Sequence, residues 1–257
     1  MNEENLIKYY NKFNEDKRLN TRHGNIEFIT AITYINKYIH KDNKILDIGA
    51  GTGKYSIYFY NEGYDVTAVE LVKHNLRVLE KKEPNIKAYQ GNALNLKFPD
   101  NSFDIILLFG PMYHLIDFED KLKALKEAKR VLKPNGKIFI SYCMNEYAVI
   151  THGFIENNIK ESLKNNLLDK DYKITPATND LYSFVRLEDI NKLNKLSNLK
   201  RVKILSHDGP TEYIKKVVNK MDNDTYKEYI NYHLNTCERK ELLGAGRHIL
   251  DIVTKVE

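Results

Sequence analysis

The chain has 257 residues, with 40 Lys and Arg against 35 Asp and Glu and therefore a formal net charge of +5. This length is enough for one large domain with insertions, and 12 Gly and 6 Pro without a Pro-rich or Gly/Ser-rich tract argue against a long flexible linker. A hydrophobic fraction of 42% excludes an intrinsically disordered chain, and no run of about 18 apolar residues predicts a membrane-spanning helix.

Apolar, β-branched runs alternate with stretches of helical periodicity in the first part of the chain. The runs predict strands at residues 44–49, 64–70, 86–90, 103–110 and 136–143. The stretches between them predict helices at residues 54–62, 74–82 and 118–132. Near-continuously apolar strands separated by helices of this length are typical of a parallel sheet with helices on both faces.

Further elements flank this core on both sides. Residues 3–40 predict two amphipathic helices joined near residues 20–24, and residues 145–180 are polar and less regular. The C-terminal part predicts helices at 187–196, 211–220 and 223–243, and strands at 201–206 and about 247–255. We therefore expect one α/β domain with a seven-stranded Rossmann-like sheet.

Within residues 1–257 we expect four parts. They are an N-terminal helical cap at 1–42, a ligand-binding core at 43–144, and two lid insertions at 145–180 and 209–245.

Three of the 12 glycines fall within five residues, in ILDIGAGTGKYS (45–56), after a predicted strand and at the start of a predicted helix. Because glycine allows sharp turns and close backbone approach, this context is typical of a loop that binds a nucleotide-like ligand at a helix N-terminus. Glu70 ends the second predicted strand, where an acid can accept hydrogen bonds from a ribose diol.

The spacing of the loop distinguishes between classes of nucleotide. Gly49, Gly51 and Gly53 alternate with single residues, which matches neither the GxGxxG dinucleotide fingerprint nor the GxxxxGK[ST] phosphate-binding loop. Asp47 precedes them, where its charge repels a pyrophosphate and attracts a ligand ammonium group. The loop therefore favours a positively charged nucleoside without phosphate, and a nicotinamide enzyme fits it worst.

DIGAGTG with Asp47, followed by Glu70, resembles the cofactor site of class I S-adenosylmethionine-dependent methyltransferases. The segments GNALNLKFPDNSFDIILLFG (91–110) and LKPNGKIFIS (132–141) resemble the family's later motifs in order and spacing. The resemblance covers roughly residues 40–145 and implies the seven-stranded methyltransferase sheet with S-adenosylmethionine as cofactor. Asn92 departs from the Asp that many members carry, but a neutral amide can still accept a hydrogen bond from the adenine amino group.

The resemblance also implies roles for individual residues. It places Asp47 near the methionine amino group of the cofactor and Glu70 at its ribose hydroxyls. It places Arg22, in the N-terminal segment, as a partner of the cofactor carboxylate. The remaining cofactor-binding residues would line the methionine tail or the adenine, or would let the backbone run close to the cofactor. They are Gly49, Ala50, Gly51, Gly53, Leu71, Asn92, Ala93, Phe109 and Gly110.

The fourth predicted strand ends in FGPMYHL (109–115), at the edge where open α/β sheets bind ligands. The [ND]PP[YF] motif of enzymes that methylate nucleobase or glutamine nitrogens is absent there. Tyr113 and His114 are the candidate catalytic residues. His114 can act as a general base, or it can only hydrogen-bond backbone or cofactor, and a thiol, amine or ionised oxygen acceptor needs no base.

Three residues in the expected lids are candidate substrate contacts: Tyr147, His152 and His233. His233 belongs to a stripe at helical spacing that is more typical of an apolar core face than of a cavity wall. The sequence does not identify the acceptor.

Composition and charge limit the compartment, the metal sites and the partners that we expect for the protein. Two cysteines are too few for a disulfide framework, and no CxxC or HxxxH spacing predicts a metal site. The N-terminal segment lacks the basic start and apolar stretch of a signal peptide, so we expect a cytoplasmic protein without a membrane partner. The scattered lysines do not favour nucleic acid as a partner, and the oligomeric state is not readable.

We therefore predict an S-adenosylmethionine-dependent methyltransferase that transfers the sulfonium methyl group to an O, N or S atom of a small molecule under a helical lid. Two alternatives stay open: a methyltransferase that modifies a tRNA base, and a regulatory protein that binds S-adenosylmethionine without catalysis.

Overall fold

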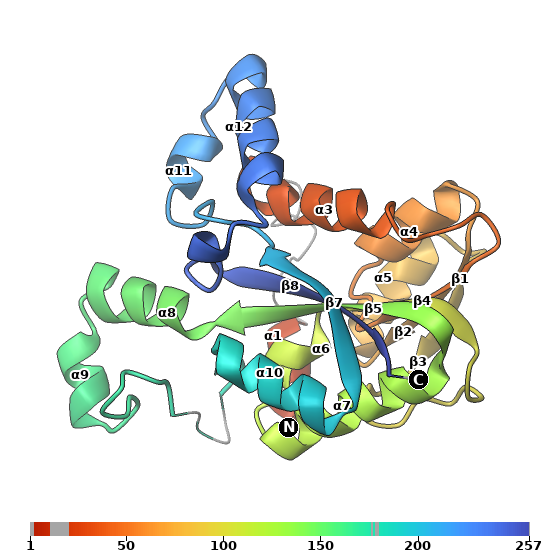
Figure 1. Ribbon diagram of the computed structural model, residues 1–257, viewed down its shortest axis with the longest axis horizontal. Coiled ribbons are helices and arrows are strands. Elements are labelled where there is room, and N and C mark those ends of the chain that lie inside the picture. The colour runs from red at the N-terminus through yellow and green to blue at the C-terminus, as the bar shows by residue number, and fades with distance from the viewer. Residues whose placement is uncertain (1–2, 11–20, 176, 178–179, 257) are drawn as a thin grey trace.

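The computed structural model describes residues 3–10, 21–175, 177 and 180–256. Its centre is one mixed sheet in the order β3-β2-β1-β4-β5-β8-β7, with the short strand β6 paired to β5 (Figure 1). The strands are β1 (Lys44–Ile48), β2 (Asp65–Glu70), β3 (Lys87–Gln90), β4 (Phe103–Leu108), β5 (Leu132–Met144), β6 (Phe184–Val185), β7 (Leu199–Ser206) and β8 (His248–Lys255).

The direction of the strands creates a crevice at one edge of the sheet. Strands β1 to β5 run parallel, whereas β8 runs antiparallel to both β5 and β7. The chain builds outward from β1 through β2 to β3 and then returns to place β4 on the other side of β1. The carboxyl ends of β1 and β4 therefore lie at the point where the strand order reverses, which is where open α/β sheets bind ligands.

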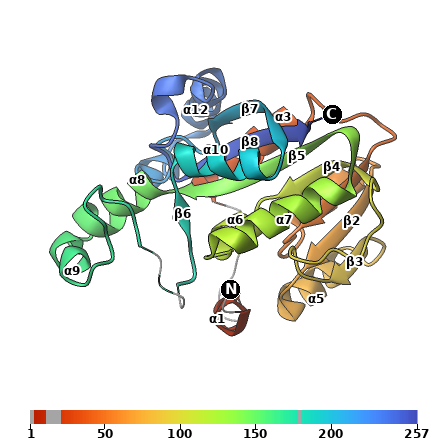
Figure 2. The same cartoon turned by 60° about the horizontal axis from the view of Figure 1, so that its bottom comes forward.

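Helices cover both faces of the sheet (Figure 2). On one face α3 (Arg22–Ile35), α4 (Lys54–Asn61) and α5 (Lys73–Lys82) pack on side chains such as Ile45 and Val66. On the other face α7 (Phe118–Val131) and α10 (Leu187–Leu196) pack on side chains such as Leu46 and Ile106. Neighbouring residues of β1 point to opposite faces, and because helices cover both faces, Ile45, Leu46 and Ile48 are all buried.

Shorter helical elements surround the crevice and its neighbourhood. They are α1 (Glu3–Tyr10), α6 (Pro111–His114), α8 (Asn145–Ala148), a π-helical turn (Val149–Ile155), α9 (Ile159–Lys164), α11 (Lys215–Val218), α12 (Asn223–Thr236) and a 3₁₀ turn (Lys240–Leu242). The segment from α8 to α9 projects from the sheet as an arm, and α11 and α12 pack beside α3 (Figure 1).

The α/β class and the seven predicted strands are confirmed, and the structure adds β6, which is too short for a pattern to reveal. The predicted helix at 211–220 is wrong in its first half, because Thr211 donates a hydrogen bond to the Asp208 carbonyl and residues 211–214 form turns. The predicted helix at 223–243 ends at Thr236. Beyond it the carboxylate of Glu238 binds Tyr34 and Lys203, which draws the chain toward the sheet.

Two further structural findings bear on earlier expectations. The second N-terminal helix begins at Arg22, close to the predicted junction, whereas residues 11–20 lie outside the described part of the chain. Among the described residues, no helix combines the length and the apolar character needed to cross a bilayer.

Candidate functional site

The loop after β1 forms one wall of a pocket at the crevice. Gly49, Gly51 and Gly53 have φ angles of +75°, +57° and +91°, a left-handed conformation that side chains disfavour. The three glycines therefore let the chain reverse sharply between the end of β1 and the start of α4. A hydrogen bond from the Gly49 N–H to the Val69 carbonyl (2.8 Å) fixes the loop to β2.

The three glycines face different surroundings. A Cβ atom on Gly49 would lie 2.7 Å from Cδ of Pro111, and one on Gly53 would lie 2.7 Å from Cγ of Leu79. These two positions thus need glycine for close packing as well as for backbone conformation. A Cβ on Gly51 would meet no atom within 4 Å, and Gly51 lines the pocket. Gly51 therefore forms an open cradle that a ligand can fill.

Asp47, the penultimate residue of β1, lines the same pocket with only 2% of its surface exposed. The Ser56 hydroxyl donates a hydrogen bond of 2.6 Å to its Oδ2. Burial nevertheless raises the pKa of Asp47 to about 7, and the charge of nearby Glu70 adds to the rise. A cationic ligand group in the pocket would compensate this cost of the ionised form.

Glu70, the last residue of β2, shapes the loop directly. Its Oε2 accepts a hydrogen bond from the Gly51 N–H and its Oε1 accepts one from the Val72 N–H, both at 2.8 Å. Burial raises the pKa of Glu70, while these backbone donors and the Asn75 side chain act against the rise. The carboxylate thus holds the cradle open, and each oxygen keeps lone-pair capacity for a ligand hydroxyl.

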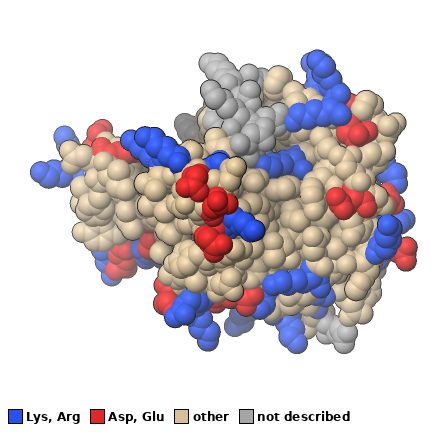
Figure 3. All heavy atoms as spheres, turned by 90° about the horizontal axis from the view of Figure 1, so that it is seen from above, with Lys and Arg blue, Asp and Glu red and all other residues tan. Residues whose placement is uncertain are grey.

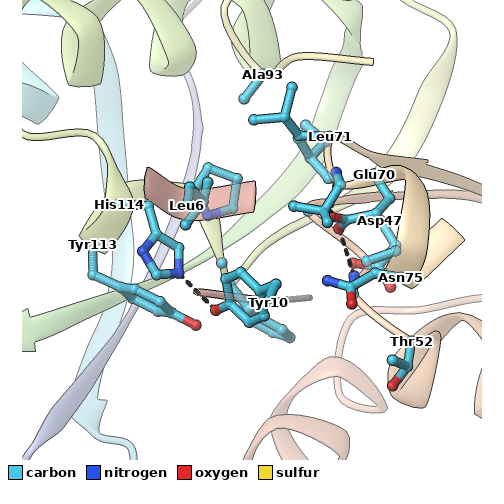
Figure 4. A pocket seen from close by; sticks show the side chains of 18 of the residues that line it. Leu6, Tyr10, Asp47, Thr52, Glu70, Leu71, Asn75, Ala93, Tyr113 and His114 are labelled. Atoms are coloured by element: carbon cyan, nitrogen blue, oxygen red, sulfur yellow. Dashed lines mark hydrogen bonds between the residues drawn. The ribbon is translucent and has the colours of Figure 1, made fainter. Parts of the chain in front are cut away.

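Helix α1 and helix α6 form the opposite wall (Figure 4). The Tyr10 hydroxyl lies 2.8 Å from Nε2 of His114, and Nδ1 of His114 lies 2.9 Å from the Leu181 carbonyl oxygen. Because a carbonyl only accepts, Nδ1 carries the hydrogen and Nε2 accepts from Tyr10. The imidazole therefore joins three segments that are distant in the sequence.

This environment fixes the protonation state of His114. Burial lowers its pKa to about 4, so the ring is neutral at physiological pH. Both ring nitrogens have hydrogen-bond partners, which favours a positioning role over the general-base role. Tyr113 also lines the pocket, with its ring centroid 4.7 Å from that of His114, and its carbonyl accepts a hydrogen bond from Ser183.

The structure brings together most of the residues expected at the site. The predicted residues that line the pocket are Asp47, Gly49, Ala50, Gly51, Glu70, Leu71, Asn92, Ala93, Phe109, Gly110, Tyr113 and His114. Gly53 does not line the pocket and instead precedes α4 as its capping residue.

The expectation for Arg22 does not agree with its position. Its guanidinium donates a hydrogen bond of 2.7 Å to Asn223 and lies 5.2 Å from the ring centroid of Tyr226, so it joins α3 to α12 outside the pocket. Among the described residues that line the pocket, Lys54 is the only lysine or arginine. It directly follows the glycine loop, a position that the sequence could have indicated.

The three candidate substrate contacts also lie outside this pocket. Tyr147 and His152 line a second cavity of about 380 Å³ inside the arm, where His152 pairs with Glu156 at 2.9 Å. His233 is buried against α3, with its Nε2 3.0 Å from the Thr30 hydroxyl. A structural role explains the contacts of each of these side chains. Burial lowers the pKa of His233.

The second cavity nevertheless adjoins the pocket. Leu181 and Tyr182 line the second cavity, and the Tyr182 ring centroid lies 5.1 Å from that of His114. Further pocket residues were not predicted because no local motif marks them: Leu6, Tyr10, Glu27, Tyr55 and Asn75. Over the described part of the chain, no group of three or more His, Cys, Asp or Glu side chains could hold a metal ion.

Comparison with known proteins agrees with this geometry. Residues 46–140 match the family model described as a methyltransferase domain. Over 98 residues the chain is 38% identical to a demethylmenaquinone methyltransferase of Paenarthrobacter aurescens, a match that spans 38% of each chain. Over 104 residues it is 36% identical to an uncharacterized methyltransferase of Bacillus subtilis, spanning 38% of this chain and 40% of that one.

Solved structures share the whole fold at lower identity. An S-adenosylmethionine-dependent methyltransferase from Thermotoga maritima matches with a TM-score of 0.61 and 17% identity, covering 98% of this chain and 99% of that one. One from Methanosarcina mazei matches with a TM-score of 0.60 and 17% identity, covering 87% and 97%. The sequence matches span well under half of the length of the curated relatives.

Three observations indicate the same kind of domain: the order of the strands, the glycine loop between two buried acids, and the segment that matches the family model. Residues 46–140 therefore form a methyltransferase domain, and the fold of the chain is that of solved S-adenosylmethionine-dependent methyltransferases.

Proposed function

We propose that this protein transfers the methyl group of S-adenosylmethionine to a small molecule. The observation that carries the proposal is the open cradle at Gly51 between the buried carboxyl groups of Asp47 and Glu70. A buried acid with a raised pKa fits a ligand that brings a positive charge, and a carboxylate fixed by backbone donors fits a pair of hydroxyls. The cofactor would supply an electrophilic methyl group on a sulfonium sulfur.

The residues of the pocket divide among the parts of this cofactor. Asp47 would hold the ammonium group, Glu70 the ribose hydroxyls and Lys54 the carboxylate. The adenine and the methionine tail would lie along the residues at the ends of β2, β3 and β4: Leu71, Asn92, Ala93, Phe109 and Gly110. Lys54 takes the role expected of Arg22, because it lines the pocket and Arg22 does not.

The covered wall of the pocket supports a small acceptor. Leu6 and Tyr10 of α1 lie over the pocket, and the hydrogen bond from Tyr10 to His114 fastens the helix to α6 (Figure 4). A covered site admits a compact molecule more easily than a folded RNA. On the face drawn in Figure 3, acidic and basic side chains are interspersed, which does not favour a polyanionic partner.

We also propose the division of the chain in which residues 1–42 form a cap, 43–144 hold the cofactor and 145–180 and 209–245 are lids. The ring contact between Tyr182 and His114, and the packing of α11 and α12 on α3, support a role of these segments beside the pocket.

Calorimetric titration of the purified protein with S-adenosylhomocysteine tests the cofactor assignment. We expect micromolar binding. Incubation with methyl-labelled S-adenosylmethionine and either a small-molecule fraction or an RNA fraction then tests the acceptor. We expect label in the small-molecule fraction. Label in RNA alone would favour the tRNA enzyme, binding without transfer would favour the regulatory protein, and no binding would contradict the whole proposal.

A further inference from the structure

The second cavity, formed by the arm and by the chain that returns from the arm to β6, has the size of a ligand-binding site (Figure 1). Its volume of about 380 Å³ lies within the range of about 300 to 1,000 Å³ that is usual for sites that bind small molecules. Protein interiors normally leave few voids larger than a water molecule. None of the described residues that line this cavity lines the cofactor pocket, so the cofactor assignment does not account for it.

The lining of the cavity is mainly apolar. Its aliphatic and phenyl side chains come from the π-helical turn, from the segment after α9 and from the segment that leads into β6: Val149, Leu167, Leu168, Ile174, Leu181 and Phe184. The rings of Tyr147 and Tyr182 add further apolar surface. Such a lining stabilises a ligand in proportion to the apolar surface that the ligand withdraws from water.

The charged side chains of the lining lie in solvent and have partners. Nδ1 of His152 lies 2.9 Å from a carboxylate oxygen of Glu156, and the Asp180 carboxylate accepts a hydrogen bond of 2.7 Å from the Ala177 N–H. Both His152 and Asp180 are exposed, so water and salt screen their charges. Among the described residues that line the cavity there is no lysine, arginine or glutamate. A neutral ligand therefore fits this cavity better than an ion.

Buried and charged contacts hold the walls of the cavity together. Asn145, with 1% of its surface exposed, donates a hydrogen bond of 3.0 Å to the Tyr172 carbonyl and accepts one of 2.9 Å from the Ile174 N–H. The Arg186 guanidinium donates a hydrogen bond of 2.6 Å to the Glu146 carboxylate. These contacts join the start of the arm to the returning chain, so the cavity is a fixed feature of the fold.

One layer of rings separates the second cavity from the cofactor pocket. Tyr113 and His114 line the pocket (Figure 4), whereas Tyr182 lines the cavity. The Tyr182 ring centroid lies 5.1 Å from that of His114 and 6.1 Å from that of Tyr113. The Ser183 N–H donates a hydrogen bond of 2.7 Å to the Tyr113 carbonyl, which fixes this segment beside α6. A ligand that fills the cavity therefore has one end beside the rings that line the cofactor pocket.

We infer that the second cavity binds the apolar body of the methyl acceptor, with the atom to be methylated at the end beside Tyr182 and His114. The acceptor is then a neutral, mainly apolar molecule with a nucleophilic group at one end. The inference rests on the proposed function and adds to it the chemical class of the acceptor and the place where the acceptor binds.

The test uses protein loaded with S-adenosylhomocysteine and a series of straight-chain primary alkanols of increasing length, each kept below its solubility limit. Binding is measured by ligand-observed NMR and calorimetry. We expect the affinity to rise about 3- to 4-fold for each added methylene group and to level off once the chain fills the cavity. Alkylammonium and carboxylate ions of the same length should bind about 10-fold or more weakly, because the cavity does not compensate the loss of their hydration.

The orientation of the bound alkanol is tested in the same samples. A nuclear Overhauser signal between the two ligands should join S-adenosylhomocysteine to the hydroxymethyl end of the alkanol, because that end is expected beside Tyr182 and His114. A signal from the methyl end alone would contradict the placement of the nucleophilic group.

Three variants make the test specific. Val149→Phe puts a larger side chain into the cavity and should weaken binding of the longer alkanols about 10-fold or more, with the affinity for S-adenosylhomocysteine within about 2-fold. Ile150→Phe is the matched control and should change neither affinity, because Ile150 is 40% exposed and does not line the cavity. Leu168→Ala enlarges the cavity and should move the levelling-off to longer alkanols, which decides the matter if Val149→Phe does not fold.

The contrary outcomes are distinct. An affinity that does not depend on chain length, tighter binding of the ions, or equal behaviour of Val149→Phe and Ile150→Phe together with an unmoved levelling-off in Leu168→Ala would overturn the assignment of the cavity alone. Failure of the unmodified protein to bind S-adenosylhomocysteine would instead overturn the proposed function, and with it the role of the cavity as an acceptor site.

Discussion

The two walls of the pocket are assembled from contacts of very different sequence range. On the wall formed by the glycine loop, Ser56 binds Asp47 across 9 positions and Gly51 binds Glu70 across 19. On the opposite wall, the Tyr10–His114 hydrogen bond spans 104 positions and the His114–Leu181 bond spans 67. The first wall is therefore fixed by one βαβ unit, whereas the second exists only when distant segments dock. In the proposed function the first wall binds the cofactor and the second faces the acceptor, and we call them the cofactor wall and the acceptor wall.

The largest expected effect is on the cofactor wall. Asp47→Asn should weaken S-adenosylhomocysteine binding about 100-fold or more, because a buried ligand ammonium loses its countercharge. The same change should stabilise the free protein by up to about 4 kcal/mol above pH 7, because the folded state no longer holds a desolvated carboxylate. Calorimetry and denaturant unfolding measure the two effects. A variant that loses both affinity and stability would contradict this role.

The glycines of the loop should separate packing from binding. Gly49→Ala should destabilise the fold by about 2 kcal/mol or more, because the new Cβ would lie 2.7 Å from Pro111 in a left-handed residue. Gly51→Ala should cost about 1 kcal/mol in stability, since its Cβ meets only open space, yet weaken cofactor binding about 10-fold by filling the cradle. If Gly49→Ala and Gly51→Ala weakened cofactor binding equally under conditions in which both variants are folded, this would argue against a ligand at Gly51.

Cofactor binding should depend on pH near neutrality. The pKa of Asp47 is raised to about 7, so its proton must leave before the carboxylate can bind an ammonium group. The affinity for S-adenosylhomocysteine should therefore fall up to about 10-fold for each pH unit below about 7. Stability should show the opposite sign, because the raised pKa favours the folded state at low pH and that contribution is lost as pH rises through 7. The affinity is to be measured over about two pH units, between about pH 5.5 and about pH 8. An affinity that does not change with pH over this range would contradict the coupling.

The two candidate cations can be compared directly. Lys54→Met should weaken S-adenosylhomocysteine binding about 10-fold, because it removes the basic group on the pocket wall. Arg22→Met should leave that affinity within about 2-fold and lower stability instead, because Arg22 joins α3 to α12. The reverse pattern in calorimetry would restore the original expectation for Arg22.

The smallest expected effect is on the acceptor wall. Tyr10→Phe removes one hydrogen bond to His114, which corresponds to about 1 kcal/mol and thus to about 5-fold faster amide exchange in residues 3–10. Cofactor affinity at equilibrium should change little. If exchange in this helix is unaffected, the hydrogen bond does not fasten α1.

The same difference in contact range explains which parts of the molecule could be predicted. The strands, the glycine loop, Asp47 and Glu70 follow from local pattern, because their positions depend on one alternation of strand and helix. Glu27 could not be predicted, since nothing within α3 shows that it meets His248. Arg22 lies outside the pocket for a similar reason, because its partners lie on α12, about 200 positions away.

The lid residues show the same limit. Tyr147 and His152 were grouped with the site only because they follow β5, and the arm instead folds them around its own cavity. His233 lies on a stripe that is more typical of a core face than of a cavity wall, and it is buried against Thr30. Long-range packing decides such positions, and sequence spacing does not record it.

A crystal structure of the complex with S-adenosylhomocysteine tests the central claim most directly. The account predicts the ligand ammonium against Asp47, the ribose hydroxyls at Glu70 and the adenine beside Leu71. A complex in which the ligand lies elsewhere would contradict the division of the pocket into a cofactor wall and an acceptor wall.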